Sequence, residues 1–208
     1  MREAGPGGPA TRRCLVVLAA AALARPAPAT ASPGDQTPMA PPDPGRAVVG
    51  PDRILRLGPL SWRCALGKGG IRADKREGDG ATPVGLLPLR RLLYRADRVA
   101  APACRVPVEP LSPSDGWCDD PADAAYNRPV RRPYPASHEA LWREDHVYDL
   151  IGVLGWNDDP VQRGRGSAIF LHLARPDVAP TEGCIALAER DLRAALAAGL
   201  TAIEVHGG

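Results

Sequence analysis

The residue types best suited to covalent chemistry lie in one segment near the C-terminal end of the sequence. His172 ends an apolar run, and Cys184 follows twelve positions later, directly after Gly183. A thiol nucleophile needs a base that takes its proton, and N–H donors that stabilise the oxyanion of a tetrahedral intermediate. His172 can be the base, and backbone N–H groups around Gly183 and Cys184 can be the donors, since glycine lets the chain turn tightly. The segment favours thiol catalysis, although on spacing alone both residues could equally belong to a core.

The residues around Cys184 resemble a known signature. The run from Thr181 through Cys184 to Ile185, preceded by a strand-ending histidine, is similar to the Ser/Thr-His-Gly-Cys signature of YkuD-type L,D-transpeptidases. Upstream, residues 67–69 (Gly-Lys-Gly) and 82–85 (Thr-Pro-Val-Gly) resemble the glycine-containing strand end and the Thr-Pro-x-Gly turn of that family, in the same order. The resemblance covers most of residues 50–205.

The resemblance implies a fold, a reaction and a set of site residues. The fold would be mostly β and sandwich-like, with cysteine and histidine facing each other across a groove. Cys184 would be the nucleophile and His172 its base, oriented by the main-chain carbonyl of Leu173, while Gly183 would shape the oxyanion site and Thr181 would contact substrate. The thiolate would attack a peptidoglycan stem peptide at the L-centre of its diamino acid and expel D-alanine, leaving a thioester. The same thiol would form an adduct with a carbapenem.

The acceptor of the thioester stays open at this point. An amine from a neighbouring stem would give a 3-3 crosslink, whereas water would give an L,D-carboxypeptidase or an amidase that uses the same two residues. A third interpretation, outside the enzymes, is a non-catalytic wall-binding module with a buried cysteine. The implied location is the periplasm or the cell envelope, and no cofactor is implied.

The sequence departs from the family pattern in three places. Glu182 stands where the family usually has a second histidine, Ala186 stands where an arginine is often found, and the interval from His172 to Cys184 is short. Without that arginine, another cation must hold the carboxylate of a diaminopimelate stem, and a fixed Arg suits bidentate recognition. We expect at least one of three arginines to face the groove, with Tyr126 or Tyr134 anchoring the loop beside it; the three are Arg128, Arg131 and Arg132.

Short apolar runs between Gly and Pro turn signals predict a mostly β domain over residues 46–208. The expected strands are Ile54–Leu57, Trp62–Leu66, Gly85–Leu93, Val147–Leu154, Ile169–Leu173 and Thr201–Val205. One helix is expected over Glu189–Ala198, since Leu192, Ala195 and Leu196 share a face and Gly199 can end it. The charged run of residues 74–79 is interpreted as a solvated loop.

Residues 101–143, here called the insertion, are polar and proline-rich. They contain four of the nine aromatic residues, which indicates a shaped loop that packs on the core rather than a flexible linker; the four are Trp117, Tyr126, Tyr134 and Trp142. The insertion could be a wall or lid over a substrate groove, or a structural cover over a sheet edge.

The remaining features exclude several classes of function. A net charge of +2 gives no basic field for nucleic acid. Residues 1–45 are expected to be a signal peptide or a disordered extension, because the apolar stretch 15–24 is too short for a mature membrane span. Neither a CxxC pair nor a Cys/His cluster suggests a metal. Cys104 and Cys118 could form a disulfide, or Cys64, Cys104 and Cys118 could be three buried free thiols.

Overall fold

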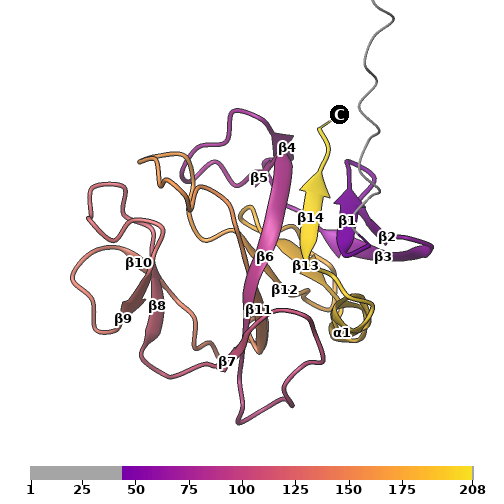
Figure 1. The fold of residues 1–208 in the computed structure, drawn as a ribbon. Helices are drawn as coiled ribbons and strands as arrows, with labels where there is room; N and C mark the ends of the chain where they lie inside the picture. Colours follow the sequence, from indigo (N-terminus) through magenta and orange to yellow (C-terminus); the bar gives the residue numbers. More distant parts are fainter. Residues whose placement is uncertain (1–43, 208) are drawn as a thin grey trace, which may run out of the picture. The chain divides into compact units, whose positions relative to one another are not determined.

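The structure is a computed structural model that describes residues 44–207, so the predicted signal peptide or disordered extension lies almost wholly outside the described residues (Figure 1). Within the described range there are fourteen strands and one helix. They are β1 (Arg46–Val49), β2 (Ile54–Leu57), β3 (Leu60–Ala65), β4 (Ile71–Arg72), β5 (Thr82–Pro83), β6 (Gly85–Tyr94), β7 (Val108–Pro110), β8 (Asp115–Cys118), β9 (Pro129–Arg131), β10 (His138–Ala140), β11 (Leu150–Leu154), β12 (Phe170–Leu173), β13 (Ile185–Leu187), α1 (Glu189–Ala197) and β14 (Ala202–Val205).

The main sheet closes on itself. Its strand order is β11-β12-β13-β3-β2-β1-β14-β6, and β6 also pairs with β11, which completes a barrel, while β7 adds to β6 from outside. β6 joins the two halves, because residues 85–88 pair with β14 and residues 89–94 pair with β11. The expected sandwich-like arrangement is therefore corrected to a closed barrel. The physical reason is the long β6, which belongs to both layers and leaves no open edge between them.

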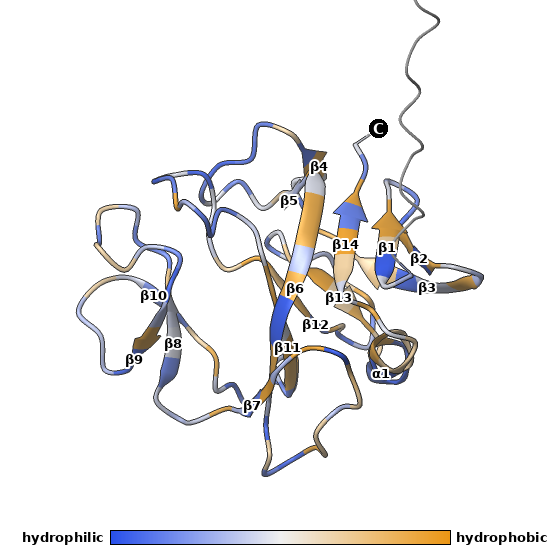
Figure 2. Ribbon diagram, in the orientation of Figure 1, coloured by the Kyte–Doolittle hydropathy of each residue, from blue (hydrophilic) through white to orange (hydrophobic). Residues whose placement is uncertain are grey.

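The barrel interior is filled by aliphatic side chains that alternate along the strands, as the period of two requires. In β11, Leu150 and Leu154 point into the main core, whereas Ile151 and Val153 belong to a second apolar cluster on the outer face. β12 divides in the same way, with Leu171 and Leu173 in the main core. Figure 2 shows apolar residues concentrated on the barrel strands, with polar residues in the connecting loops. Both faces of β11 and β12 are thus buried, which an open surface strand would not allow.

The insertion covers this outer face. Instead of the expected shaped loop, it forms a three-stranded antiparallel sheet in the order β10-β8-β9, to one side of the barrel in Figure 1. Trp117 of β8 packs edge-on against Phe170 of β12, with ring centroids 5.3 Å apart, and both belong to the second cluster. The insertion therefore covers a face of the barrel rather than only an edge.

The helix and several strands agree with the sequence predictions. Leu192, Ala195 and Leu196 are the buried residues of α1, and Gly199 follows it with φ of +98°, a conformation that favours glycine. β2 has the predicted bounds, whereas β11 begins at Leu150 rather than at Val147. None of the described helices is long and apolar enough to cross a membrane.

The cysteines of the described range are all free. Cys64 and Cys118 are buried, and Cys104 is half-buried, so the disulfide between Cys104 and Cys118 is not formed. Cys104 packs against the main core of the barrel, while Cys118 lies on β8 of the insertion. Residues 44–207 also hold no group of three or more His, Cys, Asp or Glu side chains arranged for a metal ion.

Candidate active site

His172 and Cys184 come from two neighbouring parallel strands. The β12–β13 ladder pairs Leu171 with Ile185 and His172 with Ala186, so Cys184, one residue before β13, lies level with Phe170. The Phe170 N–H donates to the Cys184 Sγ at 3.4 Å, and the thiol donates to the carbonyl of Ala168 at 3.3 Å. Because side chains alternate between the two faces of a strand, His172 and Cys184 both leave the barrel on the face covered by the insertion.

The imidazole of His172 is held in one tautomer. Its Nδ1 lies 2.9 Å from the carbonyl of Leu173, the contact that the family resemblance implied. A carbonyl can only accept, so Nδ1 carries the proton and the neutral ring keeps Nε2 as an acceptor. Tyr148 packs edge-on against the ring, with centroids 5.2 Å apart. Burial lowers the pKa of His172 to about 4, against the opposing effect of the Leu173 carbonyl, so the ring is neutral at neutral pH.

The thiol of Cys184 is neutral as well. Burial, followed by the nearby charge of Glu139, raises its pKa to about 12. A thiolate in this environment is costly unless its proton moves to a group that can share the charge. The resting pair is thus a thiol and a neutral imidazole. Such a pair suits proton transfer as substrate binds, because hydrogen bonds at an empty site often become close only in the complex.

The turn before Cys184 requires glycine. Gly183 has φ of +133°, and a Cβ at this position would lie 2.8 Å from the carbonyl oxygen of Ala81. The Gly183 N–H donates to Thr181 Oγ1 at 3.2 Å, and that hydroxyl donates to the Cys184 carbonyl at 2.6 Å. Both groups are therefore engaged in holding the turn. The Thr181 hydroxyl acts on the backbone here, and of the two N–H groups considered in the sequence, that of Cys184 is left as the candidate oxyanion donor.

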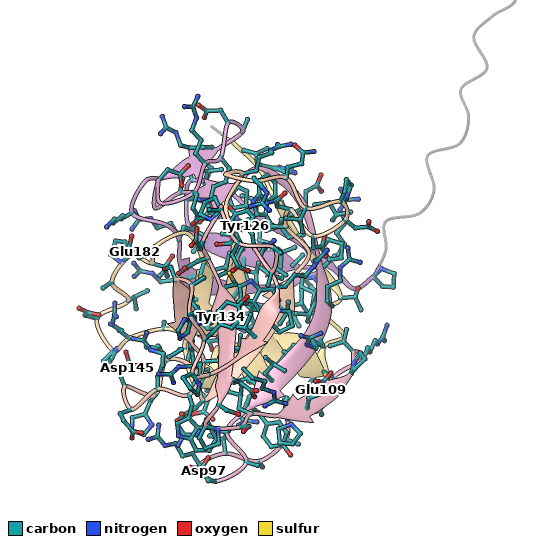
Figure 3. The ribbon with its side chains drawn as sticks, turned by 90° about the vertical axis from the view of Figure 1, so that its left-hand side faces the viewer. Asp97, Glu109, Tyr126, Tyr134, Asp145 and Glu182 are labelled. Atoms are coloured by element: carbon teal, nitrogen blue, oxygen red, sulfur yellow. The ribbon has the colours of Figure 1, made fainter. Side chains whose placement is uncertain are left out.

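Cys184 and His172 line one cavity together with charged groups of both signs. Three cations line it, Lys75, Arg143 and Arg175. Four carboxylates line it, Glu77, Asp119, Glu139 and Glu182. Figure 3 labels Glu182, which lies at the periphery of the molecule. Asp119, Glu139 and Arg143 all belong to the insertion, so this segment forms one wall of the cavity.

At least one of Arg128, Arg131 and Arg132 was predicted to face the groove, but none of the three lines this cavity. Arg128 donates to the carbonyl of Asp158 at 2.8 Å, and Arg131 pairs with Asp115 at 2.5 Å. Arg132 lines a separate hollow with Tyr134. The reason is the strand order of the insertion: β10 borders the cavity with Glu139, and β9, which ends at Arg131, lies beyond β8. The cations at the cavity are Arg143, at the last position of the insertion, and Arg175, in the loop after β12.

The two tyrosines have anchoring roles in different places. Tyr126 is buried, donates its hydroxyl to Glu77 Oε2 at 2.5 Å and accepts from the Gly166 N–H at 3.0 Å. It thus ties the insertion to the loop that lines the cavity, without lining the cavity itself. Tyr134 bonds within the insertion, donating to Asp123 at 2.8 Å. Figure 3, which views the molecule from the side of the insertion, shows Tyr126 above Tyr134.

Sequence reasoning missed several residues of the cavity, among them Lys75, Glu139 and Tyr148. Lys75 was assigned to a solvated loop, yet it is 5% exposed and pairs with Asp79 at 2.5 Å. Glu139 and Tyr148 belong to no motif in the sequence. In the structure the Tyr148 hydroxyl donates to Glu139 at 2.5 Å. The available signal was positional: Tyr148 lies just before an all-apolar strand, where a hydroxyl that is buried needs a partner.

Comparison with known proteins identifies a family. No curated protein matches the sequence. The sequence profile of the YkuD family, described as the L,D-transpeptidase catalytic domain, matches residues 51–198. The matched range holds β2 through α1, including the strands and the turn that carry His172 and Cys184. The chain therefore belongs to the YkuD family of L,D-transpeptidase catalytic domains.

Proposed function

We propose that the chain is a cysteine-dependent L,D-transpeptidase that acts on peptidoglycan stem peptides in the cell envelope. The observation that carries the proposal is the meeting of the Cys184 thiol and His172 at one cavity, with the His172 Nδ1 held by the Leu173 carbonyl. The Nε2 acceptor is the nitrogen that remains for the thiol proton. A base aligned in this way contributes about 10² to 10⁴ to the rate.

The reaction proceeds through a thioester. As the donor stem binds, the Cys184 proton passes to His172 Nε2 and the sulfur attacks the carbonyl at the L-centre of the diamino acid. The Cys184 N–H stabilises the oxyanion. Collapse breaks the bond to D-alanine, whose amine takes the proton from His172. An amine of a second stem then attacks the thioester, and the thiol is restored.

Arg175 is the cation best placed to bind a stem carboxylate. It lines the cavity and, among residues 44–207, forms no ion pair, whereas Arg143 is bound to Asp145 at 2.5 Å and Lys75 to Asp79. A free guanidinium can bind a carboxylate through two parallel hydrogen bonds. Arg175 therefore takes the role that the sequence assigned to the arginines of the insertion.

Two experiments test the proposal. Intact-mass measurement after exposure to a carbapenem should show one adduct on the wild-type chain and none on Cys184→Ala. Incubation with disaccharide tetrapeptides should release D-alanine and give 3-3 crosslinked dimers. Tripeptide without dimers would instead assign hydrolysis, the L,D-carboxypeptidase alternative. If neither the adduct nor released D-alanine is observed, the remaining interpretation is a non-catalytic wall-binding module.

A further inference from the structure

Glu139 is a carboxyl group that the proposed reaction has not used, although it lies in the reaction cavity. It comes from β10 of the insertion and lines the same cavity as His172 and Cys184. Its charge is near enough to the thiol to rank second among the causes that raise the pKa of Cys184. For the formation of the nucleophile this negative charge is therefore unfavourable, so a carboxylate here needs another explanation.

The hydroxyl of Tyr148 fixes the position of Glu139. Tyr148 is 5% exposed and donates to Glu139 Oε1 at 2.5 Å, while its ring packs against His172. One residue thus orients the carboxyl group and supports the catalytic base at the same time. Glu139 is half-buried, and Arg143 of the same cavity attracts its charge but is itself bound to Asp145. Glu139 thus has no ion pair among the described residues, and its only side-chain hydrogen bond comes from the neutral Tyr148.

A second carboxylate borders the same space. Asp119, which follows β8, also lines the cavity, although its Oδ1 is shielded from solvent. Asp119 therefore contributes to the cavity through its negative charge. The insertion places two carboxylates beside the nucleophile, and their charge favours a ligand that carries a positive charge and N–H donors.

We propose that Glu139 binds the ammonium group of the acceptor and so directs the acyl-enzyme towards an amine rather than water. This inference rests on the proposed function, since it concerns the second half of that reaction. An ammonium offers three donors to the carboxylate of Glu139, and the charge of Asp119 attracts it as well. The matching class of acceptor is a primary amine on a peptide stem, and the role of Glu139 is to determine acceptor specificity.

The transfer step balances with the groups at hand. The acceptor ammonium gives one proton to the Glu139 carboxylate, and its free electron pair attacks the thioester carbonyl. The carbon–nitrogen bond forms, the carbon–sulfur bond breaks, and the second proton passes through His172 to the Cys184 sulfur. Glu139 then releases its proton to solvent. Burial, which raises the pKa of Glu139, makes this carboxylate a better proton acceptor than an exposed one.

The test measures how the acyl-enzyme partitions between amine and water. With a tetrapeptide donor, the ratio of crosslinked dimer to tripeptide is followed against acceptor concentration for the wild type and for Glu139→Gln. Loss of a charge-assisted contact should lower this ratio about 10- to 100-fold. Acylation by the donor should become faster, because the neutral amide no longer opposes the thiolate. A change that merely disturbed the fold would slow both steps.

Matched probes separate charge recognition from general damage. Hydroxylamine, which is uncharged at neutral pH, should form hydroxamate equally well with the wild type and with Glu139→Gln. Tyr148→Phe, which removes only the hydroxyl that holds the carboxyl, should lower the amine ratio several-fold while keeping the ring beside His172. Glu144→Gln is the control, since the Glu144 side chain is 83% exposed and does not line the cavity.

The outcomes distinguish this inference from the proposed function. An unchanged dimer ratio in Glu139→Gln, or an equal fall with hydroxylamine, overturns the role of Glu139. A wild-type chain that forms the thioester but never uses an amine overturns it as well, while leaving Cys184 as the nucleophile. A wild-type chain that forms no thioester overturns the proposed function itself.

Discussion

The two walls of the cavity are built by different kinds of interaction. On one wall, His172 and Cys184 are positioned by the backbone ladder between β12 and β13. On the other, Asp119, Glu139 and Arg143 belong to the insertion. Its sheet of β8, β9 and β10 packs on the barrel through side chains, such as Trp117 on Phe170 and Tyr126 on Glu77. A ladder keeps its register when surface side chains change. The positions of the reacting groups are therefore fixed by the backbone. Replacement of side chains in the insertion can alter which substrate binds.

The largest expected effect is at Cys184. Cys184→Ala should abolish acylation, because no other cysteine lines the cavity in residues 44–207. Cys64→Ala and Cys118→Ala, at buried positions, should keep acylation whenever they remain folded, as should Cys104→Ala. Intact mass after carbapenem exposure, with a thermal melt for each variant, measures both properties. Activity retained by Cys184→Ala, or lost by a folded variant of another cysteine, would contradict the assignment of the nucleophile.

His172 should have the next largest effect. His172→Gln should slow acylation by about 10² to 10⁴ while keeping the fold, since the ring acts in proton transfer. In the wild type, a pKa of about 4 keeps the base neutral as the pH falls, so acylation should persist at pH 5 and decline near pH 4. A rate profile of acylation against pH measures this midpoint. A midpoint near 6.5, the ordinary value for histidine, would show that burial does not set the pKa of this ring.

The same pKa shift predicts how stability changes in acid. The folded-state pKa of His172 lies below its unfolded value of 6.5, so the unfolded chain binds the proton first as the pH falls. The wild type should therefore lose free energy of unfolding between about pH 6.5 and 4, by at most about 1.4 kcal/mol per pH unit. His172→Gln lacks this loss. Urea titrations at pH 7 and pH 4.5 should show a smaller decrease for the variant, and equal decreases would argue against a buried neutral imidazole.

Gly183 forms the turn that positions Cys184. Gly183→Ala should destabilise the chain by about 1 to 3 kcal/mol, because an alanine would adopt a positive φ and its Cβ would meet the carbonyl of Ala81. Acylation should fall as well, since the turn positions Cys184. Gly58→Ala is a control, because Gly58 also has positive φ but its Cβ would meet no atom within 4 Å. A Gly183 variant no less stable than the Gly58 variant would remove the steric argument.

The sequence was most informative where local pattern and site coincide. An apolar strand ending in His172, followed by Gly183 and Cys184, has a short-range signature, and so do the strand at Ile54–Leu57 and the helix before Gly199. The closure of the barrel has no such signature, because it depends on β6 pairing with both β14 and β11 across long sequence separations. β13, only three residues long, was also missed.

The charged wall was predicted least well, for a related reason. Arg128, Arg131 and Arg132 were chosen because they lie in the insertion, but the order β10-β8-β9 decides which of its strands borders the cavity. Glu139 on β10 therefore reaches the site. Lys75 was predicted to be solvated because charged runs usually lie at the surface. In the structure its ammonium group is buried, and the ion pair with Asp79 compensates its charge.

The smallest expected effects are those of the arginines in the insertion that lie away from the cavity. Arg131→Ala removes a guanidinium that is 72% exposed and pairs with Asp115 away from the cavity. An exposed pair of this kind contributes about 0 to 1 kcal/mol, so kcat/KM on free-acid stems should change less than about 3-fold. Arg128→Ala and Arg132→Ala should behave in the same way.

Arg175→Ala should differ from all three, because Arg175 lines the cavity and forms no ion pair among the described residues. Its loss should lower kcat/KM on stems with a free diaminopimelate carboxylate about 10-fold or more, but should have little effect on amidated stems, in which the carboxylate is absent. Measuring the four variants on both stems compares the cation at the cavity with the three arginines that lie away from it. A free-acid defect in Arg131→Ala, with none in Arg175→Ala, would return the carboxylate site to the insertion and show that β9 approaches the substrate.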